Sequence, residues 1–181
     1  MAAETSQMVV QIPWAAIITA ITSLVGAFGG LFFSNKANEK KWGKQIEYEK
    51  EKDRRSLLRT KGEEAFLNLK KWERELYWHY GSRVSFFAGN ITADEMLSND
   101  EKYVDHLTHS NFSALISLYF TALSDDLKNI NASIKKANEV IDEAQELGGV
   151  QASKKLAEAC TNFSKEIEIF AIKLRDAILS I

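Results

Sequence analysis

The chain has 181 residues, a formal net charge of −2, one cysteine and one proline. This length suits a single domain with a buried core, and the charge lacks the excess of lysine and arginine that a nucleic-acid-binding surface needs, which argues against DNA or RNA as the main partner. One cysteine excludes an internal disulfide and a cysteine metal cluster, and the scarcity of glycine and proline argues against a β-rich fold. The composition therefore predicts an all-α protein.

Residues 12–34 contain no charged side chain. As a helix, the run from Pro13 to Phe33 would measure about 31 Å, which matches a hydrocarbon core of about 30 Å. Pro13 suits a first helical turn and Trp14 suits the membrane–water interface. A secretory signal peptide is disfavoured because residues 1–11 hold no lysine or arginine, and a buried soluble helix is disfavoured by the length of the uncharged run. We predict a short external tail over 1–12 and a transmembrane helix over 13–34.

A charged juxtamembrane stalk is predicted over residues 35–56. Glu4 is the only charge before the uncharged run, whereas lysines follow it closely, and positive flanks stay on the cytoplasmic side. This asymmetry predicts a single-pass protein of the plasma membrane, with its N-terminus outside and the domain over 57–181 in the cytoplasm. The residues expected to anchor the helix at the two interfaces are Trp14, Lys36, Lys40, Lys41, Trp42 and Lys44.

Small residues within the same run form a GxxxG spacing. Gly26 and Gly30 lie one helical turn apart, Thr22 precedes them by a further turn, and Gly29 is adjacent. Small side chains let two helices in a membrane approach closely. The spacing therefore predicts self-association into a homo-oligomer through Thr22, Gly26, Gly29 and Gly30.

Residues 57–181 are predicted to form a helical bundle. Apolar residues recur at helical spacing from Leu58 to Tyr80, and Gly89-Asn90 should end this helix. Thr92 and Glu95 have the spacing of a capping box that starts a short helix. Ser98-Asn99-Asp100 should break it, and a longer helix should then run to Leu147 and end at Gly148-Gly149.

The last helix carries the most regular pattern in the chain. Its apolar residues alternate steps of four and three, which is typical of a coiled-coil seam. With the short glycine turn before it, this pattern predicts an antiparallel hairpin, and the stripe from Leu58 to Tyr80 supplies a third helix, giving an antiparallel three-helix bundle with one short extra helix. The seam residues are Leu156, Cys160, Phe163, Ile167, Phe170, Leu174, Ala177 and Ile181.

No catalytic constellation is evident. His106 and His109 have the i, i+3 spacing of helical metal ligands but lack a partner motif, so surface histidines are favoured. Cys160 lies on the apolar seam, which raises a thiol's pKa and leaves it unreactive. The sequence therefore predicts no enzyme, no metal and no cofactor. The exposed aromatic residues expected to form a partner surface are Tyr77, Trp78 and Tyr80.

Four short segments carry a resemblance to other proteins. They are Lys61-Gly-Glu-Glu64, Lys71-Trp72-Glu73, Gly89-Asn-Ile-Thr92 and Leu118-Tyr-Phe120. The chain resembles a group of uncharacterised bacterial single-span membrane proteins with an N-terminal span, a charged stalk and cytoplasmic helices. This resemblance implies a bacterial inner membrane and supplies no activity or functional residue.

Two functions are consistent with these patterns. The first is a membrane-anchored helical interaction or scaffold module that binds a cytoplasmic protein or itself. The alternative is an oligomeric pore-forming or membrane-disrupting effector in bacterial or phage conflict, although a span without ionisable groups would line only a weakly polar pore.

Overall fold

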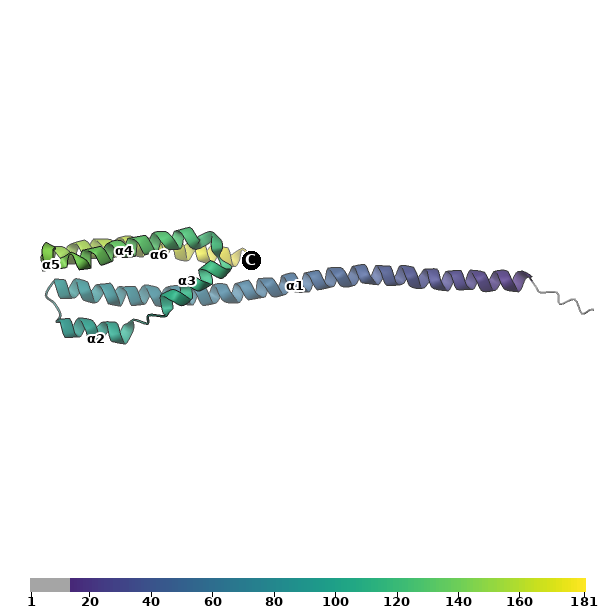
Figure 1. Ribbon diagram of the computed structural model, residues 1–181, viewed down its shortest axis with the longest axis horizontal. Coiled ribbons are helices and arrows are strands. Elements are labelled where there is room, and N and C mark those ends of the chain that lie inside the picture. Colours follow the sequence, from purple (N-terminus) through teal and green to yellow (C-terminus); the bar gives the residue numbers. More distant parts are fainter. Residues whose placement is uncertain (1–13) are drawn as a thin grey trace, which may run out of the picture. The chain divides into compact units, whose positions relative to one another are not determined.

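The computed structural model describes residues 14–181, with the side chains of residues 14, 16, 17, 27, 29, 31–33, 37 and 145 outside that description. As predicted, the fold is all-α. The helices in chain order are α1 (Trp14–Phe87), α2 (Ala93–Tyr103), α3 (Thr108–Tyr119), the 3-10 turn η1 (Thr121–Leu123), α4 (Ser124–Asp142), α5 (Ala144–Leu147) and α6 (Gly149–Leu179) (Figure 1). The chain divides into two compact units, Met1–Lys52 and Asp53–Ile181.

The first unit contains the N-terminal part of α1. The large apolar side chains that are described there are exposed, among them Ile18, Leu24 and Phe28. A search of the described residues finds no helix whose length and hydropathy would carry it across a membrane. The predicted tail over 1–12 and Pro13 lie outside the described residues, and so do the side chain of Trp14 and the surroundings of Gly29.

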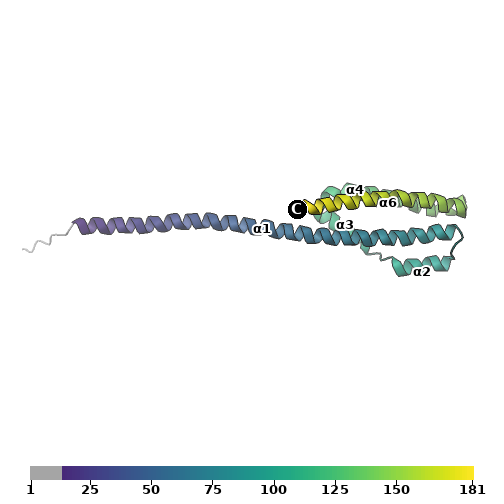
Figure 2. The same cartoon turned by 180° about the vertical axis from the view of Figure 1, so that it is seen from behind.

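The second unit is a helical bundle around one hydrophobic core. α4 and α6 lie side by side along the C-terminal part of α1, and α2 lies alongside the end of α1 (Figures 1 and 2). The core takes side chains from α1, α3, α4 and α6. Its fully buried large residues are Leu69, Phe112, Ile116, Ile130, Leu156, Ile167, Phe170 and Leu174.

The regular pattern of α6 predicted its buried face correctly. Leu156, Phe163 and Ile167 are buried along it, and Cys160 and Ala177 are half-buried against the same core. The glycine turn is also confirmed, because Gly148 has φ +77°, a conformation that favours glycine, and α6 begins at the next residue.

The capping box of α2 is confirmed, but the predicted end of that helix is wrong. Thr92 accepts a hydrogen bond from the Glu95 N–H, and the Glu95 carboxyl accepts one from the Thr92 N–H. α2 then continues through 98–100 to Tyr103. The helix ends there, with Val104 as its C-cap. Just beyond it, the Asp105 carboxyl accepts a hydrogen bond from the Leu107 N–H at 3.0 Å, a local bond that competes with helix formation.

The predicted single long helix up to Leu147 is also wrong. A second break lies at Phe120, whose backbone leaves the helical region at φ −130°, ψ 48° and whose side chain is 7% exposed. Burial of this ring accompanies the change of direction between α3 and α4. The region predicted as one helix is therefore divided into the C-terminal part of α2, α3, η1, α4 and α5.

Candidate functional site: a polar cleft beside the bundle core

A cleft of about 450 Å³ opens on the flank of the second unit. Its walls come from α1, the end of α2, the loop that follows α2, α3 and α4, and we call it the polar cleft. Most of the residues that line it carry a polar or ionisable group, although the lining surface itself is mainly apolar. The lining residues are Trp72, Glu75, Leu76, His79, Tyr80, Arg83, Asp100, Val104, Asp105, His106, His109, Asn131, Ile134 and Asn138.

One wall is a stripe of polar residues on α1. Glu75, His79 and Arg83 are spaced by four residues, so their side chains lie above one another on one side of the helix. Trp72 and Tyr80 belong to the neighbouring stripe that faces the core. The cleft therefore lies at the border between the core face and the solvent face of α1.

Glu75 is a buried carboxyl at one end of the cleft. It is 4% exposed, and its Oε1 accepts a hydrogen bond at 2.8 Å from the hydroxyl of Thr108, which is 1% exposed. The Lys71 Nζ lies 3.8 Å from the same oxygen but only 2.5 Å from an oxygen of Asp105. The hydrogen bond between them raises the pKa of Lys71 and lowers the pKa of Asp105. Lys71 is thus paired mainly with Asp105.

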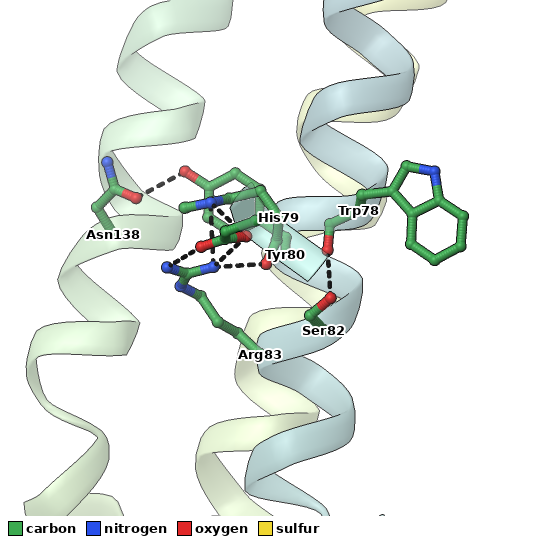
Figure 3. Close-up of polar contacts among 7 residues, drawn as sticks. Trp78, His79, Tyr80, Ser82, Arg83 and Asn138 are labelled. Atoms are coloured by element: carbon green, nitrogen blue, oxygen red, sulfur yellow. Dashed lines mark hydrogen bonds and ion pairs between the residues drawn. The ribbon is translucent and has the colours of Figure 1, made fainter. Parts of the chain in front are cut away.

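Arg83, Asp100 and His79 form a second polar group. Both Nη atoms of Arg83 contact the Asp100 carboxylate, at 2.8 and 3.1 Å, and Nη1 also donates to the His79 carbonyl oxygen (Figure 3). This is the two-pronged contact that arginine makes best with a carboxylate. Asp100 lies on α2 and the other two on α1, so the contact ties α2 to the bundle.

His79 is held in its neutral form. Burial lowers its pKa, the Arg83 cation lowers it further, and the Asp100 carboxylate opposes both. Nδ1 lies 3.0 Å from the Nη1 of Arg83 and 3.2 Å from an Asp100 oxygen. Because arginine only donates, the shorter contact assigns Nδ1 as an acceptor and places the ring proton on Nε2.

Two asparagines of α4 complete the opposite wall. The Tyr80 hydroxyl donates to the Asn138 Oδ1 at 2.6 Å, and burial raises the pKa of Tyr80 to about 12, so this donor keeps its proton (Figure 3). About two turns earlier on α4, the Asn131 Oδ1 lies 3.1 Å from the His109 Nε2, and the His109 ring lies 4.5 Å from that of Trp72. In both asparagines the amide oxygen is therefore the atom that contacts another side chain of the protein.

The predicted aromatic partner surface is only partly exposed. Tyr77 is 73% exposed, but Tyr80 is 2% exposed, so the prediction that Tyr80 belongs to a surface is wrong. Trp78 is half-buried, and its ring stacks on Tyr103 of α2 at 4.2 Å. Figure 3 shows the Trp78 side chain pointing away from His79. These aromatics therefore lie on different sides of α1.

The two histidines predicted as a pair, His106 and His109, lie in different surroundings. His106 is exposed in the loop before α3, whereas His109 is half-buried against Trp72. Ser113 Oγ lies 3.3 Å from the His109 Nε2, but an Nε2–H that donates to Asn131 has no lone pair to accept the serine proton. Within residues 14–181 as described, no group of three metal-ligating side chains is present.

The residues predicted to act in or near a membrane lie in the N-terminal part of α1. Thr22, Gly26 and Gly30 are exposed, and an added Cβ at either glycine would meet no described atom within 4 Å. The surroundings of Gly29 and the side chain of Trp14 lie outside the description. The remaining predicted anchors are exposed, namely Lys36, Lys40, Lys41, Trp42 and Lys44.

Sequence reasoning missed most of the polar cleft. The spacing of Glu75, His79 and Arg83 was a usable signal, because it places three polar residues beside the apolar stripe of α1. Asn131 and Asn138, seven residues apart, flank Ile134 on α4 in the same way. No local signal pointed to Asp100 or Thr108, whose positions depend on the turn after α2.

Comparison of the chain with protein-family models, with curated proteins and with solved structures finds no match. The site has therefore to be interpreted from its own geometry. Its charged groups are fixed by mutual hydrogen bonds, and buried aromatic rings lie beside them, which is an arrangement suited to holding a small polar ligand.

Proposed function

We propose that the protein is a membrane-anchored helical interaction module that associates with itself and has no catalytic activity. Residues 13–34 would cross the bacterial inner membrane once, with the N-terminus outside and the bundle in the cytoplasm. The lysines after the uncharged run support this orientation, because positive flanks stay inside. The bundle would present its surface, including the exposed Tyr77, to a cytoplasmic protein.

The observation that carries this proposal is a division of the N-terminal part of α1 into two faces. At about 100° per residue, the small residues fall on one side of the helix and the large apolar residues on the other. Both sets are exposed in the structure. The small face comprises Ala15, Thr19, Thr22, Ser23, Gly26 and Gly30, and the large face comprises Ile18, Ile21, Leu24, Val25 and Phe28. A small face favours close helix contact and a large apolar face favours lipid.

The threonine hydroxyls on the small face support an anchor over a pore. Thr19 donates to the Ala15 carbonyl oxygen at 2.8 Å, and Thr22 donates to that of Ile18 at 2.5 Å. Each hydroxyl is therefore satisfied within its own helix, as polar groups in hydrocarbon must be. Neither hydroxyl requires a water-filled lumen.

Extraction of membranes with alkaline carbonate tests the anchor. Leu24→Lys/Phe28→Lys places two charges in the proposed span, and each costs about 3 kcal/mol near the bilayer centre. Ile46→Lys/Tyr48→Lys makes a similar change in the exposed stalk and serves as the control. We expect the wild type and the control to stay in the membrane pellet and the first variant to be released. A wild type that is released, or two variants that behave alike, would contradict the proposal.

The native mass of the full chain in lipid nanodiscs tests self-association. We expect a dimer, and Gly26→Leu/Gly30→Leu should reduce it to the monomer, whereas Leu24→Ile on the opposite face should leave it unchanged. A dimer that survives the glycine substitutions would remove the small face from the proposal. A defined ring of roughly four or more subunits would favour the pore-forming effector instead.

A further inference from the structure

We propose that the polar cleft binds a small organic cation, a ligand with a primary ammonium or guanidinium group whose charge is balanced by Glu75. This inference goes beyond the membrane-anchored module and does not depend on it, because every residue involved lies in the second unit. It rests on the charges of the cleft, on the geometry of Glu75 and on the rings around it.

The charged groups that line the cleft, together with Lys71, pair off and leave one carboxylate over. Arg83 is neutralised by Asp100 at 2.8 Å, and Lys71 by Asp105 at 2.5 Å. Among the described residues, the cation within 4 Å of Glu75 is Lys71, which lies 3.8 Å away and is already paired to Asp105. A cation entering the cleft would therefore supply the missing counter-charge of the most buried acid in the lining. An anion would meet that acid unshielded.

The second oxygen of Glu75 is free to accept a hydrogen bond. Thr108 and Lys71 both contact Oε1, and no described residue donates to Oε2. Among the described residues, a buried side-chain oxygen without a hydrogen-bond partner is found at Glu166, not at Glu75. The Oε2 of Glu75 has no described partner either, so it is not fully buried and keeps access to solvent. Since Glu75 lines the cleft, this oxygen is the natural acceptor for an N–H group of the ligand.

Aromatic rings beside Glu75 suit the same ligand. Trp72, one turn before Glu75, is 6% exposed, lines the cleft and lies 4.5 Å from the ring of His109. The part of the indole ring that is open to the cleft would attract an ammonium or guanidinium group, more strongly where water is excluded. Neutral His79 adds no opposing positive charge, and a volume of about 450 Å³ falls in the range of small-molecule sites.

Calorimetric titration of the full chain in an uncharged detergent tests the inference. The probe is phenethylamine, compared with its neutral isostere 2-phenylethanol. Butylamine, which carries an alkylammonium group alone, and agmatine, which carries both an alkylammonium and a guanidinium group, follow. Glu75→Gln removes the charge and keeps an acceptor for Thr108. Asp125→Asn is the matched control, because it removes the same charge from an exposed residue of α4 outside the cleft.

We expect phenethylamine to bind the wild type and Asp125→Asn with equal affinity, and Glu75→Gln at least tenfold more weakly. 2-Phenylethanol should bind the wild type at least tenfold more weakly than the amine, a comparison that needs no variant to fold. Equal affinity of the amine for wild type and Glu75→Gln would overturn the inference. So would equal affinity of amine and alcohol, or the absence of binding by all three amines at millimolar concentrations.

Discussion

The hydrogen bond between Thr108 and Glu75 is expected to hold the turn after α2 against α1. Thr108 is 1% exposed and begins α3, and Glu75 is 4% exposed on α1, so the 2.8 Å bond joins two elements inside the bundle. Thr108→Val has nearly the same shape and removes only the donor. A hydrogen bond to a charged group contributes about 1.5–3 kcal/mol, so we expect this variant to lose about 2 kcal/mol of unfolding free energy.

The double variant gives the sharper result. Glu75→Leu alone leaves the Thr108 hydroxyl buried without its acceptor, which costs about 1–3 kcal/mol. Thr108→Val/Glu75→Leu replaces both partners by apolar groups, so its cost should fall below the sum of the single costs by about 1 kcal/mol or more.

Urea unfolding of the full chain, followed by circular dichroism in one uncharged detergent, measures these differences from the transition midpoints at constant slope. Costs of the two single substitutions that add to within about 0.5 kcal/mol in the double variant would refute the reasoning, because they would show that the two side chains are not coupled. A Thr108→Val variant as stable as the wild type would refute it equally.

Three further predictions concern backbone space, protonation and thiol reactivity. Gly81→Ala has no neighbouring atom within 4 Å and should gain about 0.5–1 kcal/mol, whereas the Cβ of Gly149→Ala would lie 2.6 Å from the Phe87 carbonyl oxygen and should lower the melting temperature. The pKa of His79 is lowered in the folded chain, so the unfolded chain binds a proton at His79 first as the pH falls through about 6.5. The unfolding free energy of the wild type should therefore fall more steeply with acid than that of His79→Gln. Burial raises the pKa of Cys160 to about 11, so its alkylation at pH 8 should be roughly a hundredfold slower in the folded than in the denatured chain.

The features that the sequence predicted well are those that depend on local pattern. The face of α6 follows from apolar residues such as Leu156 and Phe163, because a long run of alternating steps leaves one face to bury. The start of α2 follows from Thr92 and Glu95, which satisfy each other's backbone groups without help from elsewhere. The turn at Gly148 follows from the conformational freedom of glycine.

The features that it predicted wrongly depend on contacts between distant residues. Asp105, just after α2, is bound by Lys71, 34 positions away, and no local sequence pattern predicts that contact. Phe120 breaks the next helix while its ring is buried in the core. Tyr80 was expected to join Tyr77 in a surface, but it lies four residues after the buried Leu76 and so shares the core stripe of that residue. Tyr77 lies about 100° from Leu76 around the helix and is exposed.

The polar cleft shows why the candidate site was harder to predict than the core. Burying Leu69 or Ile130 requires only an apolar partner of suitable size, and many residues can supply one. A buried carboxyl such as Glu75 requires a donor at one position, and the sequence does not show that Thr108 provides it. Well-packed apolar residues in place of such a polar group are often as stable or more so. Stability is therefore a weak explanation for the acid in this cleft, and ligand binding, tested by the response of the amine titration to Glu75→Gln, is the stronger one.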